Sequence, residues 1–320
     1  MRPDVRVANT VGEGKARGDV RRLSPGSNVL LSAFVALTAA ATILLFVFSA
    51  DTDTMWAWTI QPPLTAAFLG AGYCAGLVLV ALALRDRVWA NARIPMITVL
   101  IFTILTLVAT LLHLDRFHLH TAHSEMARLA AWVWLVVYLV VPVALAAAVV
   151  YQSRIPGVDP PRRQPMPRWL GGLLLVQAVI MLAVGVVLFT DPKAAVNVWP
   201  WALTPLTSRM VAAWLIAFGF AAVLAFWERD LRRLEIDSIG YVVFGTLQFI
   251  ALIRYGDQVR WGSPAATVYI IVLPTILVAG VAGWLLSVMG REEEYPGTAV
   301  TAREQRHLDG AALKGGASRE

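Results

Sequence analysis

Residues 64–84 read LTAAFLGAGYCAGLVLVALAL, and residues 206–226 read LTSRMVAAWLIAFGFAAVLAF. Each stretch is almost entirely apolar and has the length, roughly 20 residues, that a helix needs to cross a bilayer core about 30 Å thick. The second stretch starts 142 positions after the first and opens with the same Leu-Thr pair. The two stretches therefore predict a membrane-spanning helix that occurs twice in the chain.

Further stretches of the same character bring the number of expected membrane-spanning helices to eight. They are residues 29–50, 64–84, 94–114, 129–151, 170–189, 207–227, 238–255 and 267–289. None contains Asp or Glu, and their apolar residues are continuous rather than alternating, which favours helices over a membrane β-barrel. In the whole chain 58% of residues are hydrophobic and only 15% are charged, with a mean hydropathy of +0.65. This composition excludes a soluble enzyme, a disordered scaffold and a secreted disulfide-rich module, because soluble domains carry about 25% charged residues.

The basic residues predict the orientation in the membrane. The two tails and every second loop hold 21 of the 27 Lys and Arg residues, and the alternate loops hold the other 6. Because loops rich in Lys and Arg stay in the cytoplasm, both termini are predicted to be cytoplasmic. Most basic residues would then lie beside anionic lipid headgroups, so the net charge of +6 requires no nucleic-acid partner. The first span is expected to be retained, since its apolar core of about 22 residues exceeds that of a signal peptide.

The predicted fold class is an all-α membrane protein of two tandem parallel four-helix repeats, with both termini inside. Residues 64–115 align without a gap onto residues 206–257, and 13 of the 52 aligned positions are identical. The most informative matches are Thr65/Thr207, Arg87/Arg229 and Asp115/Asp257. Because four is an even number, both repeats enter the membrane from the same side, as in some transporters. The predicted parts are a disordered tail 1–28, repeats 29–151 and 170–290, a cytoplasmic linker 152–169 and a disordered tail 291–320.

Aromatic residues precede the second span of each predicted repeat. Trp56-Ala57-Trp58 resembles Trp199-Pro200-Trp201, and Tyr138…Pro142 in the fourth span parallels Tyr269…Pro274 in the eighth. The tryptophans fit an interfacial aromatic belt, and the alternative is a surface on which a sugar or aromatic ligand stacks. Thr204-Pro205 predicts a helix N-cap followed by proline at the first helical position.

A polar stripe is predicted on the third and seventh spans. One face of the third span carries Thr103, Thr106, Thr110 and His113, and the aligned positions of the seventh are Gly245, Gln248, Leu252 and Tyr255, with Tyr241 one turn away. These side chains either pack two helices together or line a seam for a small neutral or amphipathic ligand. Asp115 and Asp257, at the outer ends of the same spans, either pair with Arg116 and Arg254 or assist ligand entry.

Histidines gather in one predicted extracytoplasmic loop. His118, His120 and His123 are residue types that bind Zn²⁺ or Cu²⁺, and the alternative is a solvated polar loop. No recognised metal, nucleotide or nucleophile motif occurs in the chain, and Cys74 is the only cysteine. The sequence therefore predicts no cofactor.

Three function classes remain open. The first is binding or transport of a small neutral or amphipathic molecule through the seam between the third and seventh helices. The second is a non-catalytic membrane subunit or assembly factor, and the third is a membrane enzyme with a site in the histidine loop. The excess of Arg over Lys, 24 against 3, suggests a GC-rich bacterial genome and hence a bacterial inner membrane.

Overall fold

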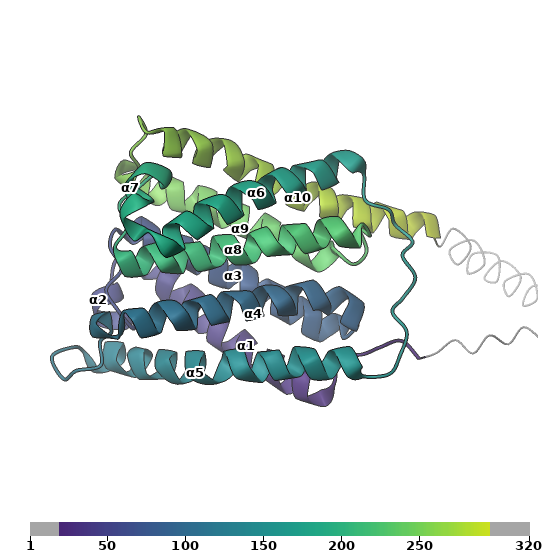
Figure 1. The fold of residues 1–320 in the computed structure, drawn as a ribbon, viewed down its shortest axis with the longest axis horizontal. Coiled ribbons are helices and arrows are strands. Elements are labelled where there is room, and N and C mark those ends of the chain that lie inside the picture. Colours follow the sequence, from purple (N-terminus) through teal and green to yellow (C-terminus); the bar gives the residue numbers. More distant parts are fainter. Residues whose placement is uncertain (1–18, 295–320) are drawn as a thin grey trace, which may run out of the picture.

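Helices form at the places where the sequence predicts membrane spans, and they also include residues 25–28 and 291–294, which the sequence assigned to disordered tails. The computed structural model describes residues 19–294, in which the regular elements are helices, apart from three isolated β-bridges (Figure 1). Eight helices are long and apolar enough to cross a membrane, which confirms the eight predicted spans. They are α1 (Pro25–Thr42, continued by the π-helical turn Ile43–Val47), α3 (Pro63–Asp86), α4 (Trp89–Leu112), α5 (Glu125–Arg154), α6 (Arg168–Thr190), α8 (Pro205–Glu228), α9 (Glu235–Tyr255) and α10 (Pro264–Glu294).

Local chemistry defines where α8 begins. The Thr204 hydroxyl accepts a hydrogen bond from the Thr207 N–H at 3.2 Å, and the Thr207 hydroxyl accepts one from the Thr204 N–H at 2.9 Å. This reciprocal arrangement is a capping box. The N-cap predicted at Thr204-Pro205 is therefore confirmed. The short helices α2 (Thr52–Met55) and α7 (Ala195–Val198) precede α3 and α8 at the same end of the bundle.

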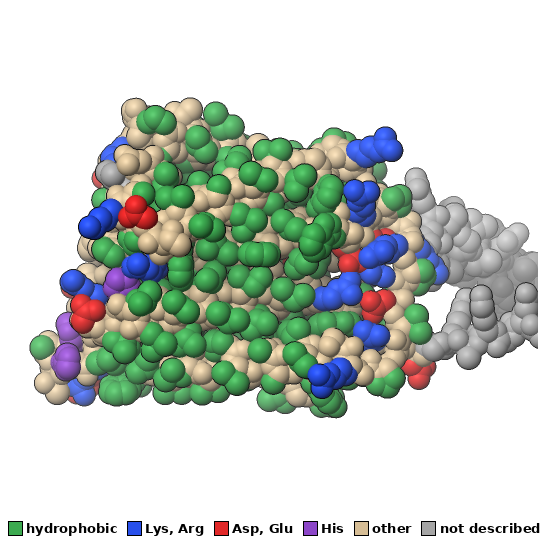
Figure 2. Space-filling view, in the orientation of Figure 1, with side chains coloured by type: hydrophobic (Ala, Val, Ile, Leu, Met, Phe, Trp, Pro, Cys, Tyr) green, Lys and Arg blue, Asp and Glu red, His purple; other side chains and the backbone are tan. Residues whose placement is uncertain are grey.

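The eight helices run side by side and alternate in direction (Figure 1). We call the end at which α1 begins and α10 ends the terminal end, and the opposite end the distal end. Figure 2 shows that apolar side chains cover the side of the bundle in view, whereas Lys and Arg gather at its ends. This distribution suits a molecule whose sides face hydrocarbon and whose ends face water.

Four helices form the centre of the bundle. Helix α3 packs against α9, and α4 packs against α8. Each central helix has an outer neighbour, since α1 packs on α3, α5 on α4, α6 on α8 and α10 on α9. In the most apolar stretches of α3 and α8, 67% and 72% of the residues are buried, against 22% in α1. A Cβ on Gly70 of α3 would lie 2.6 Å from the backbone N of Phe46, so glycine is required where α1 meets α3.

The same local structure occurs at aligned positions of the two halves. Arg87 and Arg229 end α3 and α8 in the left-handed conformation, with φ of 56° and 52°, and they are the only non-glycine residues with positive φ within residues 19–294. The backbone N–H of His118 donates to the Ala57 carbonyl at 2.9 Å, and that of Arg260 donates to the Pro200 carbonyl at 2.8 Å.

The tryptophans before α3 and α8 differ from the prediction. Trp56, Trp58, Trp199 and Trp201 are each at most 5% exposed, so they belong to the core rather than to an interfacial belt. Trp134 lies edge-on to Trp56 and Trp58, as Tyr269 does to Trp199 and Trp201. The counterpart of Tyr269 by contacts is therefore Trp134, which corrects the parallel drawn with Tyr138.

The linker between α5 and α6 is held by charges at the terminal end. Glu228, at the end of α8, is buried and accepts hydrogen bonds from Arg93 of α4, Arg162 of the linker and Arg233. Three guanidinium groups compensate the loss of hydration of this carboxylate. The cluster therefore ties the linker to helices of both halves.

Candidate ligand-binding site

A cavity of about 310 Å³ lies among α1, α3, α4 and α5. We call it the α1–α5 cavity. Its inner wall is aromatic and consists of Trp56, Tyr73, Phe102, Trp134, Tyr138 and Trp214. Phe102 and Trp214 stack with their ring centroids 3.8 Å apart. Large rings held in such contacts make a rigid wall, because each is packed on more than one neighbour.

The cavity opens on the surface of the bundle between α1 and α5. Three of its lining residues on α5, Met126, Leu129 and Val133, are 51%, 60% and 44% exposed. Met126 lies in the first turn of α5, at the distal end, and Tyr138 lies twelve residues further along the helix. At a rise of 1.5 Å per residue the cavity extends about 18 Å along the helix, roughly half the thickness of a bilayer core.

The hydroxyl groups in the wall of the α1–α5 cavity are hydrogen-bonded within the protein, whereas the indole N–H groups of Trp56 and Trp214 are buried without a partner among the described residues. The Thr38 hydroxyl donates to the Phe34 carbonyl at 2.7 Å, and the Thr103 hydroxyl donates to the Leu100 carbonyl at 3.0 Å. The hydroxyls of Tyr73 and Tyr138 bond to each other at 2.6 Å. No charged side chain occurs among the described residues that line the cavity. The wall is therefore suited to hydrocarbon and offers no group for acid–base or nucleophilic chemistry.

The predicted polar stripe is buried in packing contacts. Thr106, Thr110 and Gln248 are fully buried. The Thr110 hydroxyl accepts from the Trp134 indole N–H at 3.0 Å, and the Gln248 amide donates to the Phe68 carbonyl and accepts from the Tyr269 hydroxyl. Helix α4 packs mainly on α8 and α9 mainly on α3, so the third and seventh spans do not face each other as a pair. Of the stripe, Thr103 alone lines the α1–α5 cavity.

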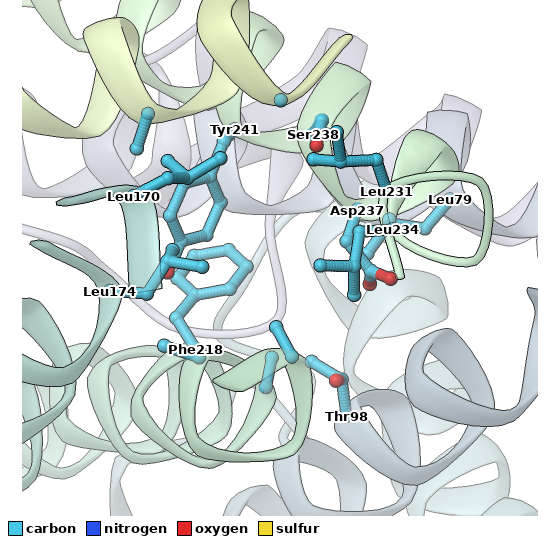
Figure 3. A pocket seen from close by; sticks show the side chains of 16 residues that line it. Leu79, Thr98, Leu170, Leu174, Phe218, Leu231, Leu234, Asp237, Ser238 and Tyr241 are labelled. Carbon is cyan, nitrogen blue, oxygen red and sulfur yellow. The ribbon is translucent and has the colours of Figure 1, made fainter. Parts of the chain in front are cut away.

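Tyr241 lies elsewhere, in a closed cavity of about 40 Å³ nearer the terminal end (Figure 3). Figure 3 shows Tyr241 beside Phe218 on one side of this cavity and Asp237 on the other. The Tyr241 hydroxyl and one Asp237 carboxylate oxygen are buried without a hydrogen-bond partner among the described residues. Asp237 lies outside the seventh span predicted from the sequence, which begins at residue 238, whereas α9 begins at Glu235.

At the distal end, His113 and Tyr255 hold neighbouring elements. His113 Nε2 lies 2.7 Å from the Arg209 guanidinium of α8. Burial, and then the Arg209 charge, lower the pKa of the His113 imidazole. A neutral imidazole can accept the guanidinium N–H, so the pair needs no proton on His113. The Tyr255 hydroxyl lies 2.7 Å from the Ser49 hydroxyl, which joins α9 to the segment after α1.

The two duplicated aspartates have different neighbours. Asp115 pairs with Arg116 at 3.0 Å, and both side chains are about 70% exposed. Asp257 is exposed, and Arg254 is turned away from it: its guanidinium donates to the Phe46 and Val47 carbonyls at the distal end of α1. Arg254 therefore caps a helix end rather than forming the ion pair considered for Asp257.

Residues 117–124 of the histidine loop are not helical, and of the three predicted ligands His118 and His123 meet whereas His120 does not join them. His118 is 3% exposed, with Nδ1 2.9 Å from the Trp56 carbonyl and Nε2 3.1 Å from the Thr59 hydroxyl. Its ring stacks on His123 at 4.1 Å, whereas His120 is exposed. Burial lowers the pKa of His118, and the hydrogen bond to Trp56 opposes the shift in part. Within residues 19–294 no group of three His, Cys, Asp or Glu side chains is placed to hold a metal ion.

Comparison of the chain with protein-family models, curated proteins and solved structures found no match.

Proposed function

We propose that this polytopic membrane protein binds the apolar chain of an amphipathic membrane molecule in the α1–α5 cavity. The observation that carries the proposal is an aromatic-walled cavity of about 310 Å³ that opens sideways between two membrane-spanning helices. A side opening at this depth meets lipid rather than water, so a ligand would enter from the bilayer. The proposed ligand class is the one expected from the sequence. The proposed site lies in the first half of the chain rather than in a seam between α4 and α9.

An amphipathic ligand fits the position of the cavity better than a wholly apolar one. The cavity reaches Met126, one residue from the start of α5, where the chain leaves the apolar part of the bundle. A chain about 18 Å long would therefore place a polar head at the distal end, beside polar residues such as His123 of the loop and Arg128 of α5. Binding of this kind serves carriage or storage of the molecule, and it requires no catalytic group.

We also infer that the chain consists of two four-helix repeats with both termini in the cytoplasm of a bacterium. The matched conformations of Arg87 and Arg229 support the repeat, as do the paired contacts of α3 with α9 and of α4 with α8. Arginines at the terminal end support the orientation, because basic loops remain inside. The terminal end would then meet anionic headgroups of the inner membrane.

Photolabelling tests the proposed site. The protein is reconstituted with a fatty acid that carries a diazirine on its chain, irradiated, digested and analysed by mass spectrometry. We expect label on peptides of α1 and α5 that line the cavity. Ala130→Phe, which places a ring in the opening, should reduce this label at least several-fold, because Ala130 lines the cavity.

The matched control is Ala36→Phe, which adds the same ring to the exposed face of α1. It should leave the label unchanged. Label spread evenly over all lipid-facing helices, or equal loss in both variants, would contradict the proposal. Stoichiometric co-purification of a protein helix that protects α1 and α5 from label would favour a membrane subunit instead.

A further inference from the structure

We propose that the second half contains a narrower counterpart of the α1–α5 cavity, between α6 and α10, which takes the same kind of apolar chain when it widens. This inference rests on the proposed function. A cavity of only about 60 Å³ lies at this place. We call it the α6–α10 cavity.

Three aromatic residues of the α1–α5 wall have aromatic counterparts in the wall of the α6–α10 cavity. Trp199 and Tyr269 line the α6–α10 cavity, as Trp56 and Trp134 line the α1–α5 cavity, and each pair lies edge to edge at 5.7 and 5.5 Å between centroids. Phe244 likewise stands 142 positions after Phe102. The second half therefore keeps the aromatic frame of the site.

Larger side chains account for the smaller volume. On α6, Met181 and Val184 line the α6–α10 cavity at the positions that follow Thr38 and Ala41 of α1 by 143 residues. Each replacement adds side-chain volume on the side that faces α10. A close-packed interior has no spare room for such additions, so they reduce the space available to a ligand.

A hydrogen bond also joins the two helices that border this cavity. The Gln177 side-chain amide of α6 donates to the Thr275 hydroxyl of α10 at 3.0 Å. Gln177 is 1% exposed, and its Oε1 has no partner among the described residues. In α1 the corresponding residue is Phe34, which lines the open cavity and forms no such bond because it has no polar atom.

The bond lies where it can control opening. Gln177 is one turn from Met181, and Thr275 is next to Ile276, both of which line the α6–α10 cavity. Side-chain hydrogen bonds between membrane helices are weak enough to break at equilibrium, so loss of this one should raise the fraction of molecules with a widened cavity about three- to thirty-fold. The narrow form of the cavity is therefore stabilised by weak interactions that single substitutions can remove.

The experiment uses the photoreactive fatty acid and the full-length protein. Thr275→Val removes the acceptor with almost no change in shape, and Thr267→Val makes the same change at an exposed position of α10 as a control. We expect Thr275→Val to raise the label on α6 and α10 peptides about three- to thirty-fold, with no rise in the control. Met181→Thr combined with Val184→Ala should create a second equivalent of bound chain without touching the hydrogen bond.

The outcomes separate this inference from the proposed function. Absence of α1 and α5 label in the unsubstituted protein would contradict the proposed function, whatever the α6 and α10 peptides show. If the folded variants bind only one equivalent of fatty acid and carry label only on α1 and α5 peptides, the inference of a second site is wrong. Strong α6 and α10 label in the unsubstituted protein would contradict the inference that this cavity is too narrow for a chain without substitution. Should Thr275→Val fail to fold, the Met181→Thr, Val184→Ala protein decides the question.

Discussion

The hydrogen bond between Tyr73 and Tyr138 allows a quantitative test of the cavity wall. The two hydroxyls lie 2.6 Å apart, and the side chains are 7% and 5% exposed. Tyr138→Phe leaves the Tyr73 hydroxyl in apolar surroundings without a partner, and Tyr73→Phe leaves the Tyr138 hydroxyl in the same state. Each should cost about 1–3 kcal/mol of unfolding free energy, because a buried hydroxyl that loses its partner keeps its desolvation penalty.

The double variant distinguishes the hydrogen bond from simple loss of atoms. With both hydroxyls removed no polar group is left unpaired, so the double variant should cost less than the sum of the single ones. The expected coupling free energy is about 1 kcal/mol. The assay is reversible unfolding in bicelles of the four proteins of this cycle. Tyr151→Phe serves as the control, since Tyr151 is 62% exposed at the other end of α5.

One result would refute this reasoning. Single variants within about 0.3 kcal/mol of the starting protein, with additive effects, would mean that water enters the cavity and satisfies the orphaned hydroxyl. A wet cavity would not suit a hydrocarbon chain. The cycle therefore tests the dryness of the wall as well as the strength of the bond.

Three further predictions concern stability. Thr204→Ala should cost about 1 kcal/mol in the same assay through loss of the α8 capping box. Gly70→Ala should cost about 1–3 kcal/mol, because the new methyl group would meet the α1 backbone, whereas Gly172→Ala has open space around it and should be neutral. The lowered pKa of His118 means that the unfolded chain binds more protons near its ordinary pKa of about 6.5, so stability should fall as pH drops through that value, and His118→Gln should weaken the dependence.

The helices could be predicted from the sequence, because a membrane span is a local property of about 20 residues. Which helices pack against each other could not be predicted from the sequence. In a membrane protein the lipid-facing and buried sides are both apolar, so the pattern does not indicate which faces meet. The polar stripe of α4 suggested contact with α9, whereas the structure packs α4 on α8. Trp56 and Trp199 were expected at an interface and are core residues for the same reason.

The sequence did not predict the place of the proposed site, and the ligand class that it suggests stays a prediction. The α1–α5 cavity depends on the loose contact of two helices that are distant in sequence, and no local pattern reports it. Alignment of the two halves could have indicated a difference in cavity size, because Thr38 and Ala41 are smaller than the corresponding residues Met181 and Val184. Thr103 is the one residue of the predicted stripe that lines the cavity, because it lies on the side of α4 that faces α1 and α5.

The most direct test of the central claim is a high-resolution density map of the protein in lipid nanodiscs. Our account predicts continuous tubular density between α1 and α5, against Phe102 and Trp134, with a polar head near Met126. A cavity filled by ordered water, or closed by contact of α1 with α5, would contradict it.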